Sequence, residues 1–141
     1  MDLLNHIDGN SRISTIPSNE AARTALNAPS DDSLRVPCYC EENVWRLACR
    51  KLANCRKSTF FAVFISSAQQ MVPMFYQRAT KSTEEACWWD YHVILLELDE
   101  KGMFFVHDVD SRLPCPLALT KYVKHSFPRD SLPQEIAPLF R

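Results

Sequence analysis

The sequence predicts an α+β domain in which a helix that begins with a thiol packs on an antiparallel β-sheet. Three observations predict this class. Apolar residues recur with helical spacing after Cys40, residues 60–65 form an apolar run of strand length, and residues 88–98 with 103–109 have the pattern of a hairpin. A chain of 141 residues has room for one such domain with a core of ordinary size.

Charge and hydropathy narrow the range of partners. The chain carries 16 basic and 17 acidic residues, a net charge of −1, so nucleic acids and anionic membranes are not expected to bind it. No apolar run approaches the roughly 18 residues needed to cross a bilayer, and no signal-peptide core follows Met1. We therefore expect the chain in the cytosol, or diffusing between cytosol and nucleus. We also expect it to be a monomer.

The six cysteines are expected to be reduced thiols. Without an export signal, a disulfide framework is not the default for such a chain. Structural zinc sites usually use paired C-x2-C sequences, and none is present here. Structural zinc is therefore not predicted.

The first 36 residues are expected to be a flexible leader. They are rich in Ser, Asn, Asp, Pro and Ala, and so they offer little apolar surface to offset the entropy of ordering. A short helix from Glu20 to Leu26, capped by Ser18 or Asn19, is the one element expected there. The folded domain is expected to span residues 37–141.

A helix is predicted from Tyr39 to about Lys57. Glu41 and Glu42 suit its first turn, where carboxylates interact favourably with the helix dipole. One face carries an apolar stripe formed by Val44, Ala48, Leu52 and Cys55.

Cys38 and Cys40 lie at the start of this helix and are candidate nucleophiles. Unpaired amides and the helix dipole favour the thiolate at such a position, whereas the two following carboxylates oppose it. Free cysteines are more often small buried hydrophobic residues. A catalytic role therefore requires a partner base.

The following segments are expected to be strands and their connections. Residues 60–65 are predicted to form a central strand covered on both faces. Residues 71–76 are expected to form a strand in which Pro73 favours an edge or a bulge. Residues 77–86 are polar and are expected to be an exposed loop.

Residues 88–98 and 103–109 are predicted to form a hairpin closed by a three-residue loop. Gly102 can adopt the left-handed conformation that such a loop requires at its last position. In this register His92 lies opposite Asp110, with Asp108 as its diagonal neighbour on the same face. A two-residue turn would move Asp108 to the other face, so the register alone leaves the choice of carboxylate open.

The remaining chain is punctuated by proline. Residues 113–117 contain two prolines and are expected to form a rigid surface connection. A short amphipathic helix is predicted from Leu119 to Phe127, ended by Pro128.

A thiol at a helix start, a histidine and an aspartate are the parts of a thiol acyl-transfer site. The histidine maintains the thiolate and later protonates the leaving amine, and the aspartate fixes the histidine tautomer. The alternative is a satisfied core histidine at residue 92, with Asp108 and Asp110 as hairpin-stabilising carboxylates.

Two longer motifs give this combination a specific interpretation. Residues 89–93 read W-D-Y-H-V, and residues 38–45 read C-Y-C-E-E-N-V-W. With these motifs, and with V-H-D-V-D at residues 106–110, the chain resembles the protein N-terminal glutamine amidohydrolase family across residues 37–141. Members of that family normally continue beyond the final Phe140-Arg141, so we expect the domain to lack the family's C-terminal part.

The resemblance implies a papain- or transglutaminase-like fold with Cys40 as nucleophile, His92 as base and Asp108 as the orienting carboxylate. It implies hydrolysis of an N-terminal glutamine side-chain amide to glutamate and ammonia, without metal or cofactor. By charge alone, Glu41, Asp90 and Asp110 are candidates to bind the substrate α-ammonium group.

The resemblance also places the reaction in the N-degron pathway, with arginyl-transferase and ubiquitin-ligase components as expected downstream partners. Two alternatives remain open. Instead of this amidase, the chain is a catalytically impaired binding module in the first alternative and a different papain-like thiol hydrolase in the second.

Overall fold

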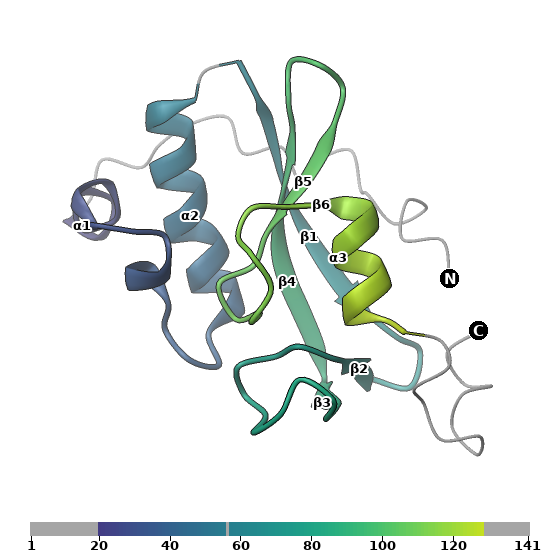
Figure 1. Ribbon diagram of the computed structural model, residues 1–141. Coiled ribbons are helices and arrows are strands. Elements are labelled where there is room, and N and C mark those ends of the chain that lie inside the picture. The colour runs from purple at the N-terminus through teal and green to yellow at the C-terminus, as the bar shows by residue number, and fades with distance from the viewer. Residues whose placement is uncertain (1–19, 56, 129–141) are drawn as a thin grey trace.

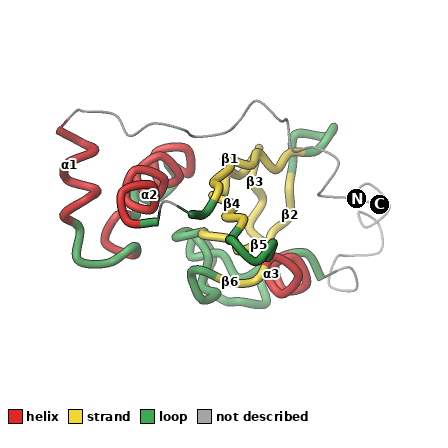
Figure 2. Tube along the Cα trace, turned by 90° about the horizontal axis from the view of Figure 1, so that it is seen from above, coloured by secondary structure: helices red, strands yellow, loops and turns green. Residues whose placement is uncertain are grey.

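A computed structural model describes residues 20–55 and 57–128 and shows an α+β fold. Helices α1 and α2 lie on one side of the main sheet, and helix α3 lies on the other (Figures 1 and 2). The elements in chain order are α1 (Glu20–Asn27), η2 (Asp32–Leu34), α2 (Cys40–Asn54), β1 (Thr59–Ser66), β2 (Val72–Met74), β3 (Cys87–Trp89), β4 (Tyr91–Leu98), β5 (Phe104–His107), β6 (Leu117–Ala118) and α3 (Leu119–Ser126).

The main sheet is antiparallel and has the strand order β1-β4-β5-β6. Strand β4 is central, and residues 92–96 are all buried. The prediction that residues 60–65 form a central strand is wrong, because β1 is an edge of this sheet and Phe64 is 57% exposed. A continuous apolar run does not specify which strand of a sheet it will be.

The expected strand over residues 88–98 is divided at Asp90 into β3 and β4. Strand β3 pairs with β2 in a separate two-stranded sheet, whereas β4 pairs with β1. The two halves of the expected strand therefore pair with different strands, and a local sequence pattern does not encode strand pairing. Pro73 pairs with Trp88 in the small sheet, where each strand has an edge, so the expectation of an edge position for Pro73 is confirmed.

The hairpin between β4 and β5 has the predicted register. Leu98 pairs with Phe104, and the Asp99 amide donates to the Met103 carbonyl at 3.0 Å. Gly102 has a φ of +79°, the left-handed conformation expected at the last loop position. This register brings the ends of β4 and β5 that carry His92 and Asp108 to the same end of the sheet.

Two apolar clusters hold the layers together. The helix predicted over residues 39–57 is observed as α2, and its buried face packs against one side of β1 and β4; this cluster includes Val44, Leu47, Ala48, Phe60, Val93 and Leu95. On the other side of the sheet, the cluster includes Ile65, Met74, Ile94, Leu96, Val106 and Tyr122. Strand β4 therefore contributes alternate residues to both clusters.

The segment from residue 20 to residue 36 differs from the flexible leader expected there. Helix α1 and turn η2 bury Ala22, Ala25 and Leu34, each no more than 2% exposed, against α2. Small alanine side chains allow the two helices to approach closely, and the stabilising surface comes from α2 rather than from the segment's own composition. Residues 1–19 lie outside the described residues.

The C-terminal part of the described chain follows the sequence expectation except for β6, a two-residue strand that was not predicted. The connection after β5 runs to β6 and contains residues 113–116, whereas Leu117, expected in the same connection, belongs to β6 and pairs with Val106. Helix α3 follows β6 and ends at Ser126, one residue before the predicted end. None of the helices in residues 20–55 and 57–128 is long and apolar enough to cross a bilayer. All six cysteines are free thiols, as expected.

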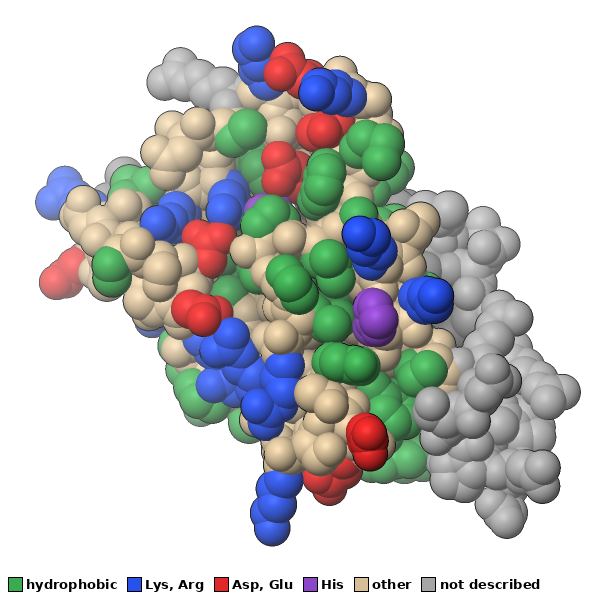
Figure 3. Space-filling model, viewed as in Figure 1, with side chains coloured by type: hydrophobic (Ala, Val, Ile, Leu, Met, Phe, Trp, Pro, Cys, Tyr) green, Lys and Arg blue, Asp and Glu red, His purple; other side chains and the backbone are tan. Residues whose placement is uncertain are grey.

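The surface carries charges of both signs. On the face shown in Figure 3, hydrophobic, acidic and basic side chains are interspersed, with one small group of basic side chains toward the lower edge. This distribution agrees with the net charge of −1.

Candidate active site

Cys40 is the first residue of α2 and is 6% exposed. Its Sγ lies 3.4 Å from Glu41 Oε2. Cys38 is exposed and has a φ of +64°, so the chain turns sharply between the two thiols. The turn places Cys40 on the buried face of the helix start and leaves Cys38 outside the core.

His92 is the second residue of β4 and is completely buried. Its Nε2 lies 3.0 Å from Asp108 Oδ2, and its ring stacks on Trp89 with centroids 5.3 Å apart. Its Nδ1 is buried and has no hydrogen-bond partner with good geometry among the described residues. The start of α2 and the start of β4 lie at the same end of the molecule (Figure 1), so Nδ1 is the nitrogen left to serve Cys40.

Asp108 follows β5 and is held by three donors. Besides His92, the Tyr122 hydroxyl donates to Oδ2 at 2.7 Å and the Asp110 amide donates to Oδ1 at 3.0 Å. Burial raises the pKa of Asp108, but the charge of His92 and the hydrogen bonds lower it by more. The pKa of Asp108 is therefore below its ordinary value. Asp108 is therefore an ionised carboxylate with a fixed orientation.

Asp110 lies on a different network. Its carboxylate accepts from Arg35 Nε at 2.8 Å and from Asn43 Nδ2 at 2.9 Å. Asn43 also bonds both the amide and the carbonyl of Val36. Asp108 is thus the carboxylate that contacts His92, and Asp110 links the chain before α2 to the chain after β5.

The charged form of His92 is strongly stabilised. Burial alone lowers the pKa of this imidazole, but the charge and hydrogen bond of Asp108, with a smaller contribution from Cys40, raise the pKa of His92 to about 10. At neutral pH the ring is therefore an imidazolium. A cationic imidazolium beside a thiol favours the thiolate form.

Glu41 is exposed and lies beside Cys40. The exposed Tyr91 hydroxyl donates to Glu41 Oε1, and this hydrogen bond is the main reason that the pKa of Glu41 is lowered. Glu41 also contacts the Cys40 thiol. An exposed negative charge is thus held beside the candidate nucleophile, whereas Asp110 is already neutralised by Arg35.

Three residues of these networks were not predicted from the sequence as functional. Tyr122 falls within the amphipathic helix predicted from Leu119 to Phe127, and no role was assigned to it, to Arg35 or to Asn43. Asn43 carried a usable signal, because it falls on the same helix face as Cys40 and Leu47, where a polar side chain needs a partner. The partner of Tyr122 lies 14 residues away and no local pattern indicates it.

This arrangement of thiol, imidazole and carboxylate has the parts of a thiol-dependent acyl-transfer site. The chain belongs to the N-terminal glutamine amidase family, whose sequence model matches residues 35–141.

Similar proteins support the same assignment. Over 96 residues, 66% of this chain and 46% of the relative, it is 41% identical to the protein N-terminal glutamine amidohydrolase of Danio rerio. Over 116 residues, 80% of this chain and 54% of the relative, it is 37% identical to the proteins of that name from Bos taurus and Homo sapiens. The chain thus spans about half the length of the curated relatives it matches.

Proposed function

We propose that this chain hydrolyses the side-chain amide of an N-terminal glutamine, giving an N-terminal glutamate and ammonia. The observation that carries the proposal is the buried contact between His92 Nε2 and Asp108 Oδ2, with the remaining ring nitrogen available to Cys40 at the start of α2. Membership of the N-terminal glutamine amidase family supports this substrate.

In the first step the Cys40 thiolate attacks the amide carbon of the substrate side chain. The carbonyl oxygen gains negative charge, and amides of the first turn of α2, which have no partner within the helix, are suited to stabilise it. The C–N bond then breaks, and His92 Nδ1 gives its proton to the departing nitrogen. Ammonia leaves, and the substrate remains as a thioester on Cys40.

In the second step water hydrolyses the thioester. His92, now neutral, accepts a proton from the water through Nδ1 while Asp108 stays bonded to Nε2. The C–S bond breaks, and the thiolate–imidazolium pair is restored. The residues thus complete a full cycle by moving one proton at one ring nitrogen.

Restriction to a chain terminus requires a group that binds the α-ammonium. Of the three candidates predicted by charge, Asp110 is buried and paired with Arg35. Glu41 is exposed, is held by Tyr91 and adjoins Cys40, and Asp90 is exposed just before β4. We propose Glu41 as the group that binds the ammonium, because only its carboxylate is fixed beside the nucleophile.

The papain- or transglutaminase-like fold is part of the same proposal. It is supported by a cysteine at a helix start, a histidine in β4 and an aspartate directly after β5, the antiparallel neighbour of β4. The cytosolic or nucleo-cytosolic location, the monomeric state and the arginyl-transferase and ubiquitin-ligase partners stay predictions from the sequence.

The experiment is mass spectrometry of a peptide with N-terminal glutamine incubated with the 141-residue chain. We expect a gain of about one mass unit, because an –OH replaces an –NH2, and we expect Cys40→Ala to abolish it while Cys38→Ala retains it. A matched peptide with internal glutamine should stay unchanged; its conversion would indicate a different thiol hydrolase. No conversion by the folded chain would contradict the proposed activity and favour a binding module.

A further inference from the structure

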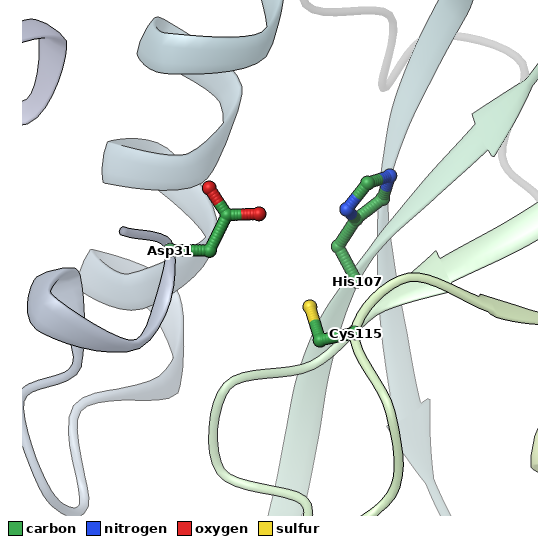
Figure 4. A group of neighbouring side chains, drawn as sticks. All are labelled: Asp31, His107 and Cys115. Atoms are coloured by element: carbon green, nitrogen blue, oxygen red, sulfur yellow. The ribbon is translucent and has the colours of Figure 1, made fainter. Parts of the chain in front are cut away.

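Three side chains that the proposed reaction does not use converge on the α2 side of the sheet. They are Asp31 before η2, His107 at the end of β5 and Cys115 in the connection to β6 (Figure 4). One carboxylate oxygen, one ring nitrogen and one sulfur, a ligand atom from each residue, lie within 4.8 Å of one another. These are three different donor types from three separate segments.

His107 is oriented as a metal-binding histidine would be. It is 1% exposed, and its Nε2 lies 2.7 Å from Glu97 Oε2. Its Nδ1 is buried and has no hydrogen-bond partner among the described residues, and Figure 4 shows a ring nitrogen directed toward Asp31. A carboxylate on one ring nitrogen fixes the tautomer that presents a lone pair on the other, as in carboxylate–histidine–zinc groups.

The protonation state of His107 agrees with this orientation. Burial is the main reason that the pKa of His107 is lowered, and the nearby charge of Lys51 lowers it further. The ring is therefore neutral at pH 7, which is the form that binds a metal.

The donor set and the spacing suit a zinc ion. In a tetrahedral site with Zn–S of about 2.3 Å and Zn–N of about 2.0 Å, ligand atoms lie about 3.5 Å apart. The three ligand atoms lie within 4.8 Å of one another, so the segments that carry Asp31 and Cys115 need to move only slightly toward His107. Sulfur and imidazole ligands favour zinc over magnesium or calcium.

Two basic side chains of α2 reduce the affinity of such a site. Asp31 pairs with Lys51 at 2.6 Å and with Arg50 at 3.3 Å. A carboxylate has about four lone-pair positions, so Asp31 has room for a further ligand, but the ammonium repels a second cation. Burial raises the pKa of the Cys115 thiol to about 12, so this thiol must lose its proton when a metal binds.

We propose that Asp31, His107 and Cys115 form a zinc-binding site with one open position for water. On binding, the Cys115 S–H bond breaks, the S–Zn bond forms and the proton passes to solvent. The ion joins the chain before η2 to the loop after β5. It lies outside the Cys40 site, and the inference does not depend on the proposed amidase activity.

The test uses Co²⁺ as the probe on the purified metal-free chain, because thiolate ligation to Co²⁺ gives a near-ultraviolet charge-transfer band. We expect the band with the wild-type chain, with Cys40→Ala and with Cys55→Ser, a matched control cysteine outside the site. We expect its loss in Cys115→Ser and in Asp31→Asn, with the folded state of each checked by circular dichroism. Competition with a zinc-binding dye should show at least a tenfold loss of Zn²⁺ affinity in both variants.

Lys51→Met is a second variant that does not rely on loss of binding. Removing the competing ammonium should tighten Zn²⁺ binding several-fold. Unchanged or weaker binding in Lys51→Met would overturn the proposed location. So would a band that survives Cys115→Ser but disappears in Cys40→Ala, or the absence of a band in the folded wild-type chain.

Discussion

The molecule contains two buried histidines that look alike locally and differ in charge. His92 on β4 and His107 on β5 each bond a carboxylate through Nε2, at 3.0 Å to Asp108 and at 2.7 Å to Glu97. Each leaves Nδ1 buried without a hydrogen-bond partner among the described residues. The pKa of His92 is nevertheless raised to about 10, whereas the pKa of His107 is lowered.

Burial lowers the pKa of both imidazoles, and the charges around each pair determine whether this effect is outweighed. Around His92 the nearby groups that favour protonation are Asp108, whose side chain is 3% exposed, and Cys40. His107 has a more exposed carboxylate partner, Glu97 at 17%, and the ammonium of Lys51 opposes its protonation. Thus a histidine–carboxylate contact alone does not define a catalytic pair, and the balance between burial and the neighbouring charges decides the protonation state of the histidine.

The largest expected effect on activity is that of Asp108→Asn, which we compare with the same change at Glu97. Asp108→Asn should lower kcat/KM for a peptide with N-terminal glutamine by about 10⁴-fold, because the imidazolium loses its counter-charge and the tautomer is no longer fixed. The pKa of His92 should fall in the same variant, as measured by NMR titration. Glu97→Gln is the matched control and should change kcat/KM by less than about threefold, since no reacting group contacts it. Equal losses would show that the two pairs are not distinct.

The two histidines should give opposite pH dependence of stability. The folded pKa of His92 lies above the ordinary value of 6.5, so its stabilising contribution is complete below pH 6.5 and is lost as the pH rises toward 10. The folded pKa of His107 lies below 6.5, so its contribution is present above pH 6.5 and is lost as the pH falls.

Urea unfolding measured from about pH 5 to pH 11 checks this prediction. His92→Gln should flatten the alkaline limb of the stability curve, and His107→Gln should flatten the acidic limb. If both variants altered the same limb, the assignment of opposite charge states would be wrong.

Glu97 should stabilise the folded chain through its hydrogen bond with His107. Glu97→Ala leaves the buried Nε2 of His107 without its partner, and we expect a loss of about 1–3 kcal/mol in the free energy of unfolding. Glu100→Ala is a suitable control, because Glu100 forms an exposed ion pair with Lys57 and should change stability by less than about 1 kcal/mol. Thermal and urea unfolding of both variants measure the difference.

Local patterns in the sequence predicted the parts of the fold that are locally determined. The helical period after Cys40 predicted α2, and the loop ending at Gly102 predicted the hairpin register that brings His92 near Asp108. Features that depend on distant partners were missed. The break at Asp90 and the edge position of β1 are set by which strands pair, which no short window encodes.

In the candidate site, too, local motifs predicted some residues, and contacts between distant segments were missed. The motifs named Cys40, His92 and Asp108, and the structure shows the His92–Asp108 contact. The choice between Asp108 and Asp110 could not be made from register, because the β4–β5 pairing ends at His107 and the carboxylates lie in the turn beyond it. The cluster of Asp31 and Cys115 around His107 joins segments far apart in sequence, and cysteine spacing gives no indication of it.

Tyr122 offers the smallest and most discriminating test of the comparison. Its hydroxyl donates to the same Asp108 oxygen that contacts His92. Among the described contacts, Glu97, the partner of His107, accepts from Ser58 and not from a tyrosine. Tyr122→Phe keeps the buried ring and removes one hydrogen bond, which should lower kcat by about tenfold with little change in KM. Because this donor lowers the pKa of Asp108, its loss should also narrow the acidic side of the kcat profile. An unchanged profile with a lower melting temperature would assign Tyr122 to packing alone, and Asp108 would then be oriented by His92 and the Asp110 amide.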